Sequence, residues 1–291
     1  MSEAPKRQEV GERQDLVWLD GVLLERAAAR IDPSDRGLLL GDGLFETVLV
    51  RAGHAEHLEL HLQRLARSAD LLAIPLPVDA PGVAVAIDEL LAALGLRQDL
   101  AALRITLTRG AGRRGLLPPE EPQSHLLVTA VPYHPPAQTA FAATIVDIRR
   151  NEGSPLSRLK SLNYLDNVLA LQQAVAAGAD EALLCNNAGA ICCASRANVF
   201  VIRGRRLQTP PLSDGVLDGI QRHLVLQHAA AAGYDVAEET LMPADLPGID
   251  EAFVTNSLMG LMPLSQIDDL ALPESTRTQE LRAWLESSTD D

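Results

Sequence analysis

The stretch Lys160-Ser161-Leu162-Asn163-Tyr164 lies just before a predicted helix, and its surroundings decide how the rest of the chain is interpreted. Positions 164, 168, 171 and 175 are apolar or aromatic, which is the spacing of one helix face. Gly178 follows them and is typical of a helix end. Lys160 is therefore expected in a loop that leads directly into a helix.

Lysine is almost absent from this chain. Of the 25 basic residues only Lys6 and Lys160 are lysines, and arginine supplies the rest. Arginine stays protonated and cannot act as an amine nucleophile, whereas lysine can. Lys160 is therefore a candidate for amine chemistry. A surface lysine retained by chance is the alternative that composition leaves open.

Composition and charge narrow the classes of function. The 291 residues are 47% apolar, which is enough for one large domain or two modest ones. No apolar run approaches the roughly 20 residues that a membrane helix needs, and residues 1–14 are too polar for a secretory signal. The net charge of −14 does not suit nucleic acid, whose phosphates require a basic surface. We therefore expect a soluble protein without nucleic-acid or membrane partners.

The three cysteines, Cys185, Cys192 and Cys193, lie close together in the sequence. Adjacent cysteines rarely bridge one another, and an odd number does not suit a disulfide framework. No combination of cysteine and histidine has the spacing of a zinc site, so no metal site is expected. Free thiols are typical of a reducing compartment, which predicts a cytoplasmic protein.

Strand and helix patterns mix along the chain without strict alternation. Hairpins are expected over residues 16–24, around the turn pair Asp20-Gly21, and over residues 181–202, where 190–202 forms the second strand. Helices are expected over residues 61–72, 79–94 and 216–232, and further strands over 46–50, 103–108, 126–131, 141–148 and 251–255. This mixture predicts an α+β fold rather than a doubly wound sheet.

Prolines at positions 132, 135 and 136 mark a change along the chain. Proline fixes φ and removes a hydrogen-bond donor, which is typical of a linker. We expect a disordered tail over residues 1–15, a small α/β domain over 16–131, an interdomain linker over 132–138, and a large domain over 139–291.

Three segments together carry a resemblance to a known family. They are the run from Asp35 to Thr47, which includes Gly41-Asp42-Gly43-Leu44-Phe45-Glu46-Thr47, the segment His61-Leu62-Gln63-Arg64-Leu65, and the stretch at Lys160. In order and spacing they resemble the class IV, or fold type IV, pyridoxal phosphate enzymes, which include branched-chain and D-amino acid transaminases and aminodeoxychorismate lyase. The resemblance runs from about Trp18 to Asp268.

The resemblance implies a two-domain fold like that of D-amino acid aminotransferase. It also implies pyridoxal 5'-phosphate as the cofactor, held mainly by the large domain, and a homodimer. The active site would lie at the cleft between the domains and would be lined in part by the partner subunit.

The resemblance assigns several cofactor contacts. Lys160 matches the catalytic lysine that carries the cofactor as a Schiff base and later moves a proton from the substrate α-carbon. Arg64 matches the arginine that binds the cofactor phosphate, for which a fork of donors is well suited. Tyr164 matches a tyrosine near the phenolic oxygen of the cofactor, and packing on its helix is the alternative. His61 is expected to pack rather than to take part in catalysis.

Two turns match further phosphate contacts of the family. Gly219-Ile220-Gln221-Arg222 opens a helix, where free backbone N–H groups favour an anion. Ile220 and Gln221 would bind through the backbone, because Gln221 replaces the family's usual threonine. Ser257 and Leu258 match a second turn, which would donate through the hydroxyl and the main-chain N–H.

Cys193 departs from the family pattern. Counting back from Asn198 places Cys193 where a glutamate usually faces the pyridine nitrogen of the cofactor. A carboxylate keeps that nitrogen protonated and makes the ring a strong electron sink, which a neutral thiol cannot do. Three possibilities stay open: an unprotonated ring, a thiolate paired with the nitrogen, or another carboxylate that substitutes. A weaker electron sink favours elimination over transamination.

Two segments point to the substrate. The run Thr108-Arg109-Gly110-Ala111-Gly112-Arg113-Arg114-Gly115 is similar to a segment of aminodeoxychorismate lyases in which Arg114 would hold a substrate carboxylate. The run from Asn256 to Pro263 resembles a turn of the same enzymes and assigns Asn256 and Met259 to the substrate. Phe45 stands where D-amino acid transaminases present a tyrosine.

The lead hypothesis is an aminodeoxychorismate lyase that forms 4-aminobenzoate and pyruvate. The alternative enzyme is a transaminase of D- or branched-chain amino acids, because paralogs with similar segments have that activity. A third hypothesis is a catalytically impaired binding protein built on the same scaffold. The retention of Lys160 in a chain so poor in lysine argues against it.

Overall fold

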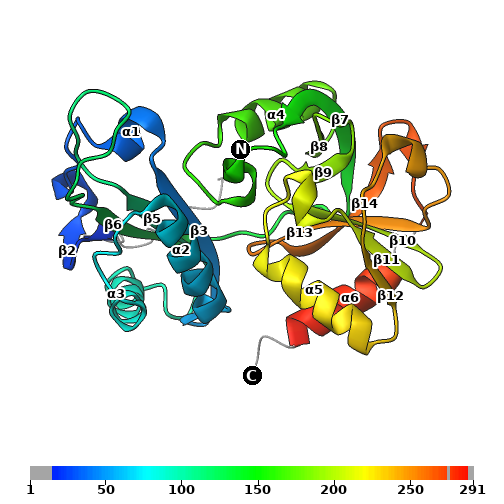
Figure 1. Ribbon diagram of the computed structural model, residues 1–291. Helices are drawn as coiled ribbons and strands as arrows, with labels where there is room; N and C mark the ends of the chain where they lie inside the picture. Colours follow the sequence, from blue (N-terminus) through cyan, green and yellow to red (C-terminus); the bar gives the residue numbers. More distant parts are fainter. Residues whose placement is uncertain (1–14, 274–275, 288–291) are drawn as a thin grey trace, which may run out of the picture.

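The computed structural model describes residues 15–273 and 276–287, which form two sheets with helices packed on them (Figure 1). The first sheet is antiparallel throughout and has the order β2-β1-β6-β5-β3-β4. Its strands are β1 (Leu16–Leu19), β2 (Val22–Glu25), β3 (Gly43–Arg51), β4 (His54–Ala55), β5 (Ala101–Thr108) and β6 (His125–Pro132). With it belong α1 (Arg36–Leu40), α2 (Leu58–Leu72) and α3 (Ala80–Ala93).

The core of this half lies between the sheet and the two longer helices. Apolar residues alternate along β5, so that Leu103, Ile105 and Leu107 are fully buried. Helix α2 packs on β3, and α3 packs on β1 and β6. The predicted hairpin turn is confirmed, because Asp20 and Gly21 have φ of 50° and 96°, as a tight turn between β1 and β2 requires.

The second sheet is mixed and larger. Its order is β12-β11-β10-β13-β14-β7-β8-β9, with β15 paired to β14, and the pairs β11–β12, β14–β7 and β7–β8 are parallel. Its strands are β7 (Phe141–Arg150), β8 (Glu181–Asn186), β9 (Ile191–Ala194), β10 (Asn198–Arg203), β11 (Arg206–Thr209), β12 (Asp235–Glu238), β13 (Glu251–Asn256), β14 (Gly260–Ile267) and β15 (Leu270–Ala271). Its helices are α4 (Leu165–Ala176), α5 (Ile220–Ala231) and α6 (Thr276–Ser287), and short 3-10 turns lie at Arg26–Ala28, Pro155–Arg158, Leu212–Asp214 and Pro243–Asp245.

The mixed α and β class predicted from the sequence is confirmed, and two element boundaries were wrong. The strand expected over 190–202 is two strands, β9 and β10, separated by residues 195–197. The helix expected from 216 begins only at Ile220, because Gly219 still has an extended backbone with φ −74° and ψ 140°. Both differences place loop residues beside the cavity described below.

The face of α4 that packs on the sheet is also different from the predicted one. Ala170 and Ala174 are fully buried against the second sheet, because small side chains let the helix approach β7 and β8 closely. Val168 and Val175, from the predicted apolar face, are 49% and 62% exposed. The apolar face of α4 therefore points to the surface.

The predicted linker lies between the two sheets. Pro132 is the last residue of β6 and Phe141 the first of β7, so residues 133–140 join the two halves. The division into domains at 16–131, 132–138 and 139–291 stays a proposal. Of the predicted tail over 1–15, residues 1–14 lie outside the described residues. Within the described ranges, no helix combines the length and the apolar character needed to cross a membrane.

Candidate active site

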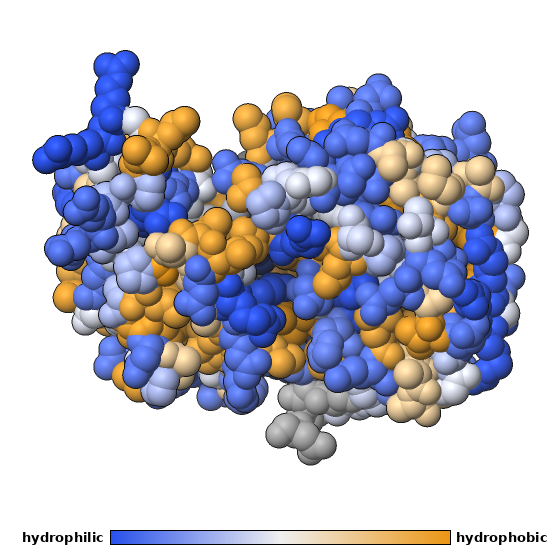
Figure 2. All heavy atoms as spheres, viewed as in Figure 1, coloured by the Kyte–Doolittle hydropathy of each residue, from blue (hydrophilic) through white to orange (hydrophobic). Residues whose placement is uncertain are grey.

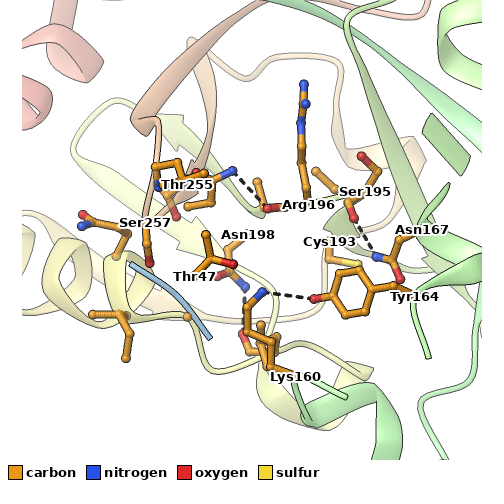
Figure 3. A pocket seen from close by; sticks show the side chains of 18 of the residues that line it. Thr47, Lys160, Tyr164, Asn167, Cys193, Ser195, Arg196, Asn198, Thr255 and Ser257 are labelled. Atoms are coloured by element: carbon orange, nitrogen blue, oxygen red, sulfur yellow. Dashed lines mark hydrogen bonds between the residues drawn. The ribbon is translucent and has the colours of Figure 1, made fainter. Parts of the chain in front are cut away.

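A cavity of about 320 Å³ is lined by residues of both sheets (Figure 3). The first half contributes Phe45 and Thr47 from β3, Arg104 from β5 and Arg64 from α2. The second half contributes residues of β7, β9, β13 and α4, the start of α5 and the loop at Lys160. The site therefore depends on how the two halves meet.

Lys160 points into this cavity. Its Nζ lies 3.4 Å from the hydroxyl of Tyr164 and 4.3 Å from the centre of the Phe45 ring. Figure 3 shows the amine and the phenol directed at one another. The loop is fixed by backbone bonds to β3: the N–H of Phe45 donates to Lys160 O, and the N–H of Leu162 donates to Gly43 O. The one lysine among the described residues is thus a cavity residue, which does not fit the surface-lysine alternative.

The start of α5 forms one end of the cavity. Ile220 and Gln221 line it, and no side chain caps the helix, so its first N–H groups are available to an anion. Gly219 is required here because an added Cβ would lie 2.0 Å from Oδ1 of Asn198. The arrangement agrees with the predicted phosphate site.

Arg64 reaches the same end of the cavity. Its Nε and Nη2 donate to the two carboxylate oxygens of Glu46 at 2.8 and 2.6 Å, and its Nη1 donates to Asp218 O at 2.7 Å. Burial alone would raise the pKa of Glu46, but the hydrogen bonds and charge of Arg64, and then those of His61, lower it to about 2. One N–H on each terminal nitrogen of Arg64 stays available to an anion.

Ser257 and Leu258 lie at this end as well. The hydroxyl of Ser257 is 3.3 Å from Nε2 of His61, whose Nδ1 is 2.7 Å from Glu46. The N–H of Leu258, expected to bind phosphate, donates instead to Oδ1 of Asn256 at 3.0 Å. The turn therefore offers the Ser257 hydroxyl rather than this backbone donor. His61 is buried, as predicted, but its contacts with Glu46 and Ser257 were not foreseen.

The opposite end contains Cys193. In Figure 3, Ser257 lies on one side of the Lys160 amine and Cys193 on the other. The thiol of Cys192 donates to Cys193 Sγ across 3.8 Å and lowers the pKa of Cys193, and the charge of Arg150 acts in the same direction, while burial opposes both. Arg150 lines the cavity too, and it is held by the carbonyls of Gly215 and Ser157.

No carboxylate lines the cavity in the part of the chain that the structure describes. The nearby Glu181 is fully buried and directed elsewhere, because it accepts hydrogen bonds from the backbone N–H of Ser195 at 3.0 Å, from the Ser195 hydroxyl and from Arg196 Nε at 3.1 Å. The possibility that another carboxylate substitutes for the usual glutamate is therefore not supported by these residues.

The predicted substrate residues are only partly brought together. Phe45 and Asn256 line the cavity, whereas Arg114 and Met259 do not. Met259 packs against the core of the second sheet. Arg114 is exposed on the segment after β5, beside Leu116 and Leu117, so its predicted contact is absent within one chain.

Arg104 is the main residue that the sequence interpretation missed. Its guanidinium carbon lies 3.9 Å from the centre of the Phe45 ring, and its strand register pairs it with Thr47. The available signal was the alternation along β5, which places Arg104 on the face opposite the core residues Leu103 and Ile105. Burial lowers the pKa of Arg104, but the side chain remains a cation at neutral pH.

Comparison with known proteins agrees with this geometry. The family model described as amino-transferase class IV matches residues 43–267. A Methanocaldococcus jannaschii protein named "Putative branched-chain-amino-acid aminotransferase" is 34% identical over 87% of this chain and 88% of its own length. The crystal structure of 4-amino-4-deoxychorismate lyase from Pseudomonas aeruginosa is 31% identical, has a TM-score of 0.82, and is matched over 95% of this chain and 100% of that chain. A branched-chain amino acid aminotransferase from T.th., solved with pyridoxamine 5'-phosphate, is 25% identical with a TM-score of 0.87, over 95% of each chain.

Proposed function

The chain belongs to the class IV aminotransferase family, whose members use pyridoxal phosphate, and we propose that it is a lyase that converts aminodeoxychorismate to 4-aminobenzoate and pyruvate. The observation that carries the proposal is the cavity end at Cys193, where a thiol and a cation stand without a carboxylate.

The residues present fit the cofactor. An uncapped helix start, the free N–H groups of Arg64 and the hydroxyl of Ser257 suit a phosphate, and the Lys160 amine suits an aldehyde. When bound, pyridoxal phosphate withdraws electrons from the substrate α-carbon. Ile220 and Gln221 would hold the phosphate through their backbone N–H groups.

Lys160 supplies the amine and holds the proton that moves during the reaction. The hydroxyl of Tyr164, 3.4 Å from Nζ, orients the amine and can share its proton. The Phe45 ring, 4.3 Å from Nζ, covers the amine from the other side and limits the access of water. The third hypothesis, a binding protein without activity, does not explain why this amine is directed into the cavity.

The residues at the other end favour elimination over transamination. A protonated ring nitrogen needs an anionic partner, and the described lining provides only the Cys193 thiol, with the Arg150 cation beside it. Arg150 opposes protonation of a neighbouring nitrogen by charge repulsion. A reaction that expels its leaving group depends less on a strong electron sink, so this end suits a lyase.

Arg104 supports an anionic substrate. It places a cation above the Phe45 ring, and no carboxylate from the described lining neutralises it inside the cavity. A planar guanidinium binds a carboxylate with two parallel hydrogen bonds. Aminodeoxychorismate carries carboxylates that can fill this role, and so do the amino acids of the alternative function.

Transamination of a D- or branched-chain amino acid is the second candidate. The 34% identity to the Methanocaldococcus jannaschii protein favours it, because that protein is named as a branched-chain aminotransferase. The two candidates differ in the partner that each assigns to the ring nitrogen. Cys193 is therefore the residue that separates them.

We also infer a cytoplasmic homodimer. Apolar side chains gather along the upper edge in Figure 2, where Figure 1 places α1 and α4. Leu38 and Leu39 of α1 are 69% and 62% exposed, Leu116 and Leu117 are 81% and 88% exposed, and Leu165 of α4 is 69% exposed. Exposed apolar patches mark interaction sites, and a second copy would place Arg114 near a neighbouring cavity. The three free, buried cysteines suit the cytoplasm.

The decisive experiment is a product assay. Purified protein is incubated with aminodeoxychorismate, and separately with panels of amino acids and keto acids, and the products are identified by mass spectrometry. Stoichiometric 4-aminobenzoate and pyruvate support the lyase. Amino-group transfer to a keto acid, without 4-aminobenzoate, would replace it with the transaminase.

A further inference from the structure

A buried line of contacts connects the first sheet with the phosphate end of the cavity. Glu46 and His61 are each 1% exposed, and Nδ1 of His61 lies 2.7 Å from Oε2 of Glu46. On its other side, Nε2 of His61 lies 3.3 Å from Oγ of Ser257, which lines the cavity. His61 is thus the only bridge, among the described residues, between a buried carboxylate and the Ser257 hydroxyl.

The protons on this line are restricted. Glu46 is ionised at neutral pH because its pKa is about 2, so its oxygens only accept hydrogen bonds. Nδ1 of His61 must therefore carry a proton and donate to Glu46. In a neutral imidazole Nε2 is then bare, and it can only accept the hydroxyl proton of Ser257.

A phosphate changes these requirements. A phosphate dianion has only acceptor oxygens, so Ser257 must donate its single hydroxyl proton in order to bind it. Oγ then has only lone pairs left for His61, and a bare Nε2 would face them without a proton between. A buried polar atom left without a partner is costly, so the line favours a proton on Nε2 in the loaded site.

We propose that His61 takes up a proton from solvent when a phosphate binds at Ser257, so that Nε2–H donates to Ser257 Oγ while the Ser257 hydroxyl donates to the phosphate. Glu46 is a positioning residue in this arrangement, because it fixes both the His61 tautomer and the guanidinium of Arg64. The inference rests on the proposed placement of the cofactor phosphate at the start of α5, and it requires no turnover.

The charged groups that face His61 determine the sign of the pH dependence. Glu46 on β3 favours the imidazolium, while Arg64 on its own helix and Lys160 in the loop disfavour it. His57, the residue before the helix, also interacts with His61. Burial lowers the pKa of His61 in this state, so the ring is neutral at neutral pH until a phosphate dianion stabilises its charge. Phosphate affinity should therefore fall as pH rises, by up to about tenfold per pH unit between the two pKa values of His61.

The test counts protons and observes the imidazole directly. Protein labelled with ¹⁵N at histidine is studied by NMR as the holoprotein and after removal of the cofactor. Calorimetric titration with pyridoxal phosphate at pH 8, in two buffers of different ionisation enthalpy, gives the proton uptake. At this pH the cofactor phosphate, with a second pKa of about 6, is already a dianion. Wild type is compared with Ser257→Ala, His61→Gln and, as the matched control, His223→Gln, which removes an exposed histidine of α5.

We expect the wild type and His223→Gln to take up about one proton more than His61→Gln and Ser257→Ala. The His61 Nε2 resonance should move from a bare to a protonated nitrogen in the holoprotein. Equal uptake in all four proteins, with an unchanged Nε2 resonance, overturns the proposal. If His61→Gln does not fold, the wild-type resonance and Ser257→Ala decide. Unchanged cofactor affinity and ³¹P shift in Ser257→Ala would show that the phosphate lies elsewhere. A negative product assay with normal proton uptake would reject only the lyase.

Discussion

The two ends of the cavity are built on different principles. At the α5 end, helix donors, Arg64 and the Ser257 hydroxyl converge on one point, and the buried carboxylate of Glu46 holds the cation in place. At the other end, Cys193 stands beside Arg150 with no carboxylate from the described lining. The first end is organised to bind an anion, and the second determines the electronic state of whatever ring lies against it. Cofactor affinity and reaction type are thus assigned to separate residues.

Lys160 lies between the two ends, and its replacement should have the largest effect. Lys160→Ala should lower turnover by on the order of 10⁴-fold, because both the nucleophile and the proton carrier are lost. Borohydride reduction of the wild type should fix the cofactor on Lys160, as peptide mapping would detect. Lys160→Arg keeps the charge and should be equally inactive. Label on another residue, or an active Lys160→Arg variant, would remove the central residue of the comparison.

At the anion-binding end, Arg64→Ala should weaken both cofactor binding and folding. It removes a phosphate donor and leaves Glu46 buried beside fewer donors, which typically costs about 3–5 kcal/mol for a broken buried pair. Cofactor titration and urea unfolding measure the two effects. Arg67→Ala, on the exposed face of the same helix, is the control and should change neither. An Arg64→Ala variant that binds cofactor normally would leave Arg64 a purely structural residue.

Acid should destabilise the same end. The pKa of Glu46 is lowered from 4.5 to about 2, so its contribution is complete above pH 4.5 and is lost as the pH falls toward 2. This contribution is about 3 kcal/mol by linkage. In Glu46→Gln the free energy of unfolding should depend less on pH across this window, whereas Glu59→Gln, at an exposed position of α2, should follow the wild type. Parallel curves for Glu46→Gln and wild type would contradict the assignment.

At the other end, Cys193→Glu should change the reaction more than the affinity. A carboxylate facing the ring nitrogen should raise transamination relative to elimination, by about tenfold for each 1.4 kcal/mol of added stabilisation. Cys193→Ser keeps a neutral group and should preserve the original ratio. Stability must be measured in parallel, because an unpaired buried carboxylate is costly. If the folded, cofactor-bound Cys193→Glu variant keeps both rates, Cys193 does not face the ring.

The sequence was most informative where chemistry is local. Lys160, Arg64 and the Ile220-Gln221 turn were identified because each combines a reactive or donor group with a short motif, and all lie at the cavity. Arg104 was missed because its place depends on the register between β3 and β5, which the sequence does not specify. Its neighbour in the same sheet, Glu46, was known only as part of a motif, and its contacts with Arg64 and His61 arise from packing between α2 and β3.

The error at α4 has a different cause. Periodicity indicated an apolar face that includes Val168, but the helix packs through Ala170 and Ala174. A hydrophobic pattern shows that a face will be covered without showing by what. Similarly, the segment of Arg114 was identified as a substrate contact, yet it lies on the surface of its own chain.

The backbone bonds between the Lys160 loop and β3 have a mechanical consequence. The chain passes from the first sheet to the second through residues 133–140, but Lys160 O and Leu162 N return to Phe45 N and Gly43 O of the first half. Covalent continuity is therefore not what holds the halves together. A protease that cuts within 133–140 should yield two fragments that still elute as one particle, with the amine of one fragment seated against the aromatic ring of the other.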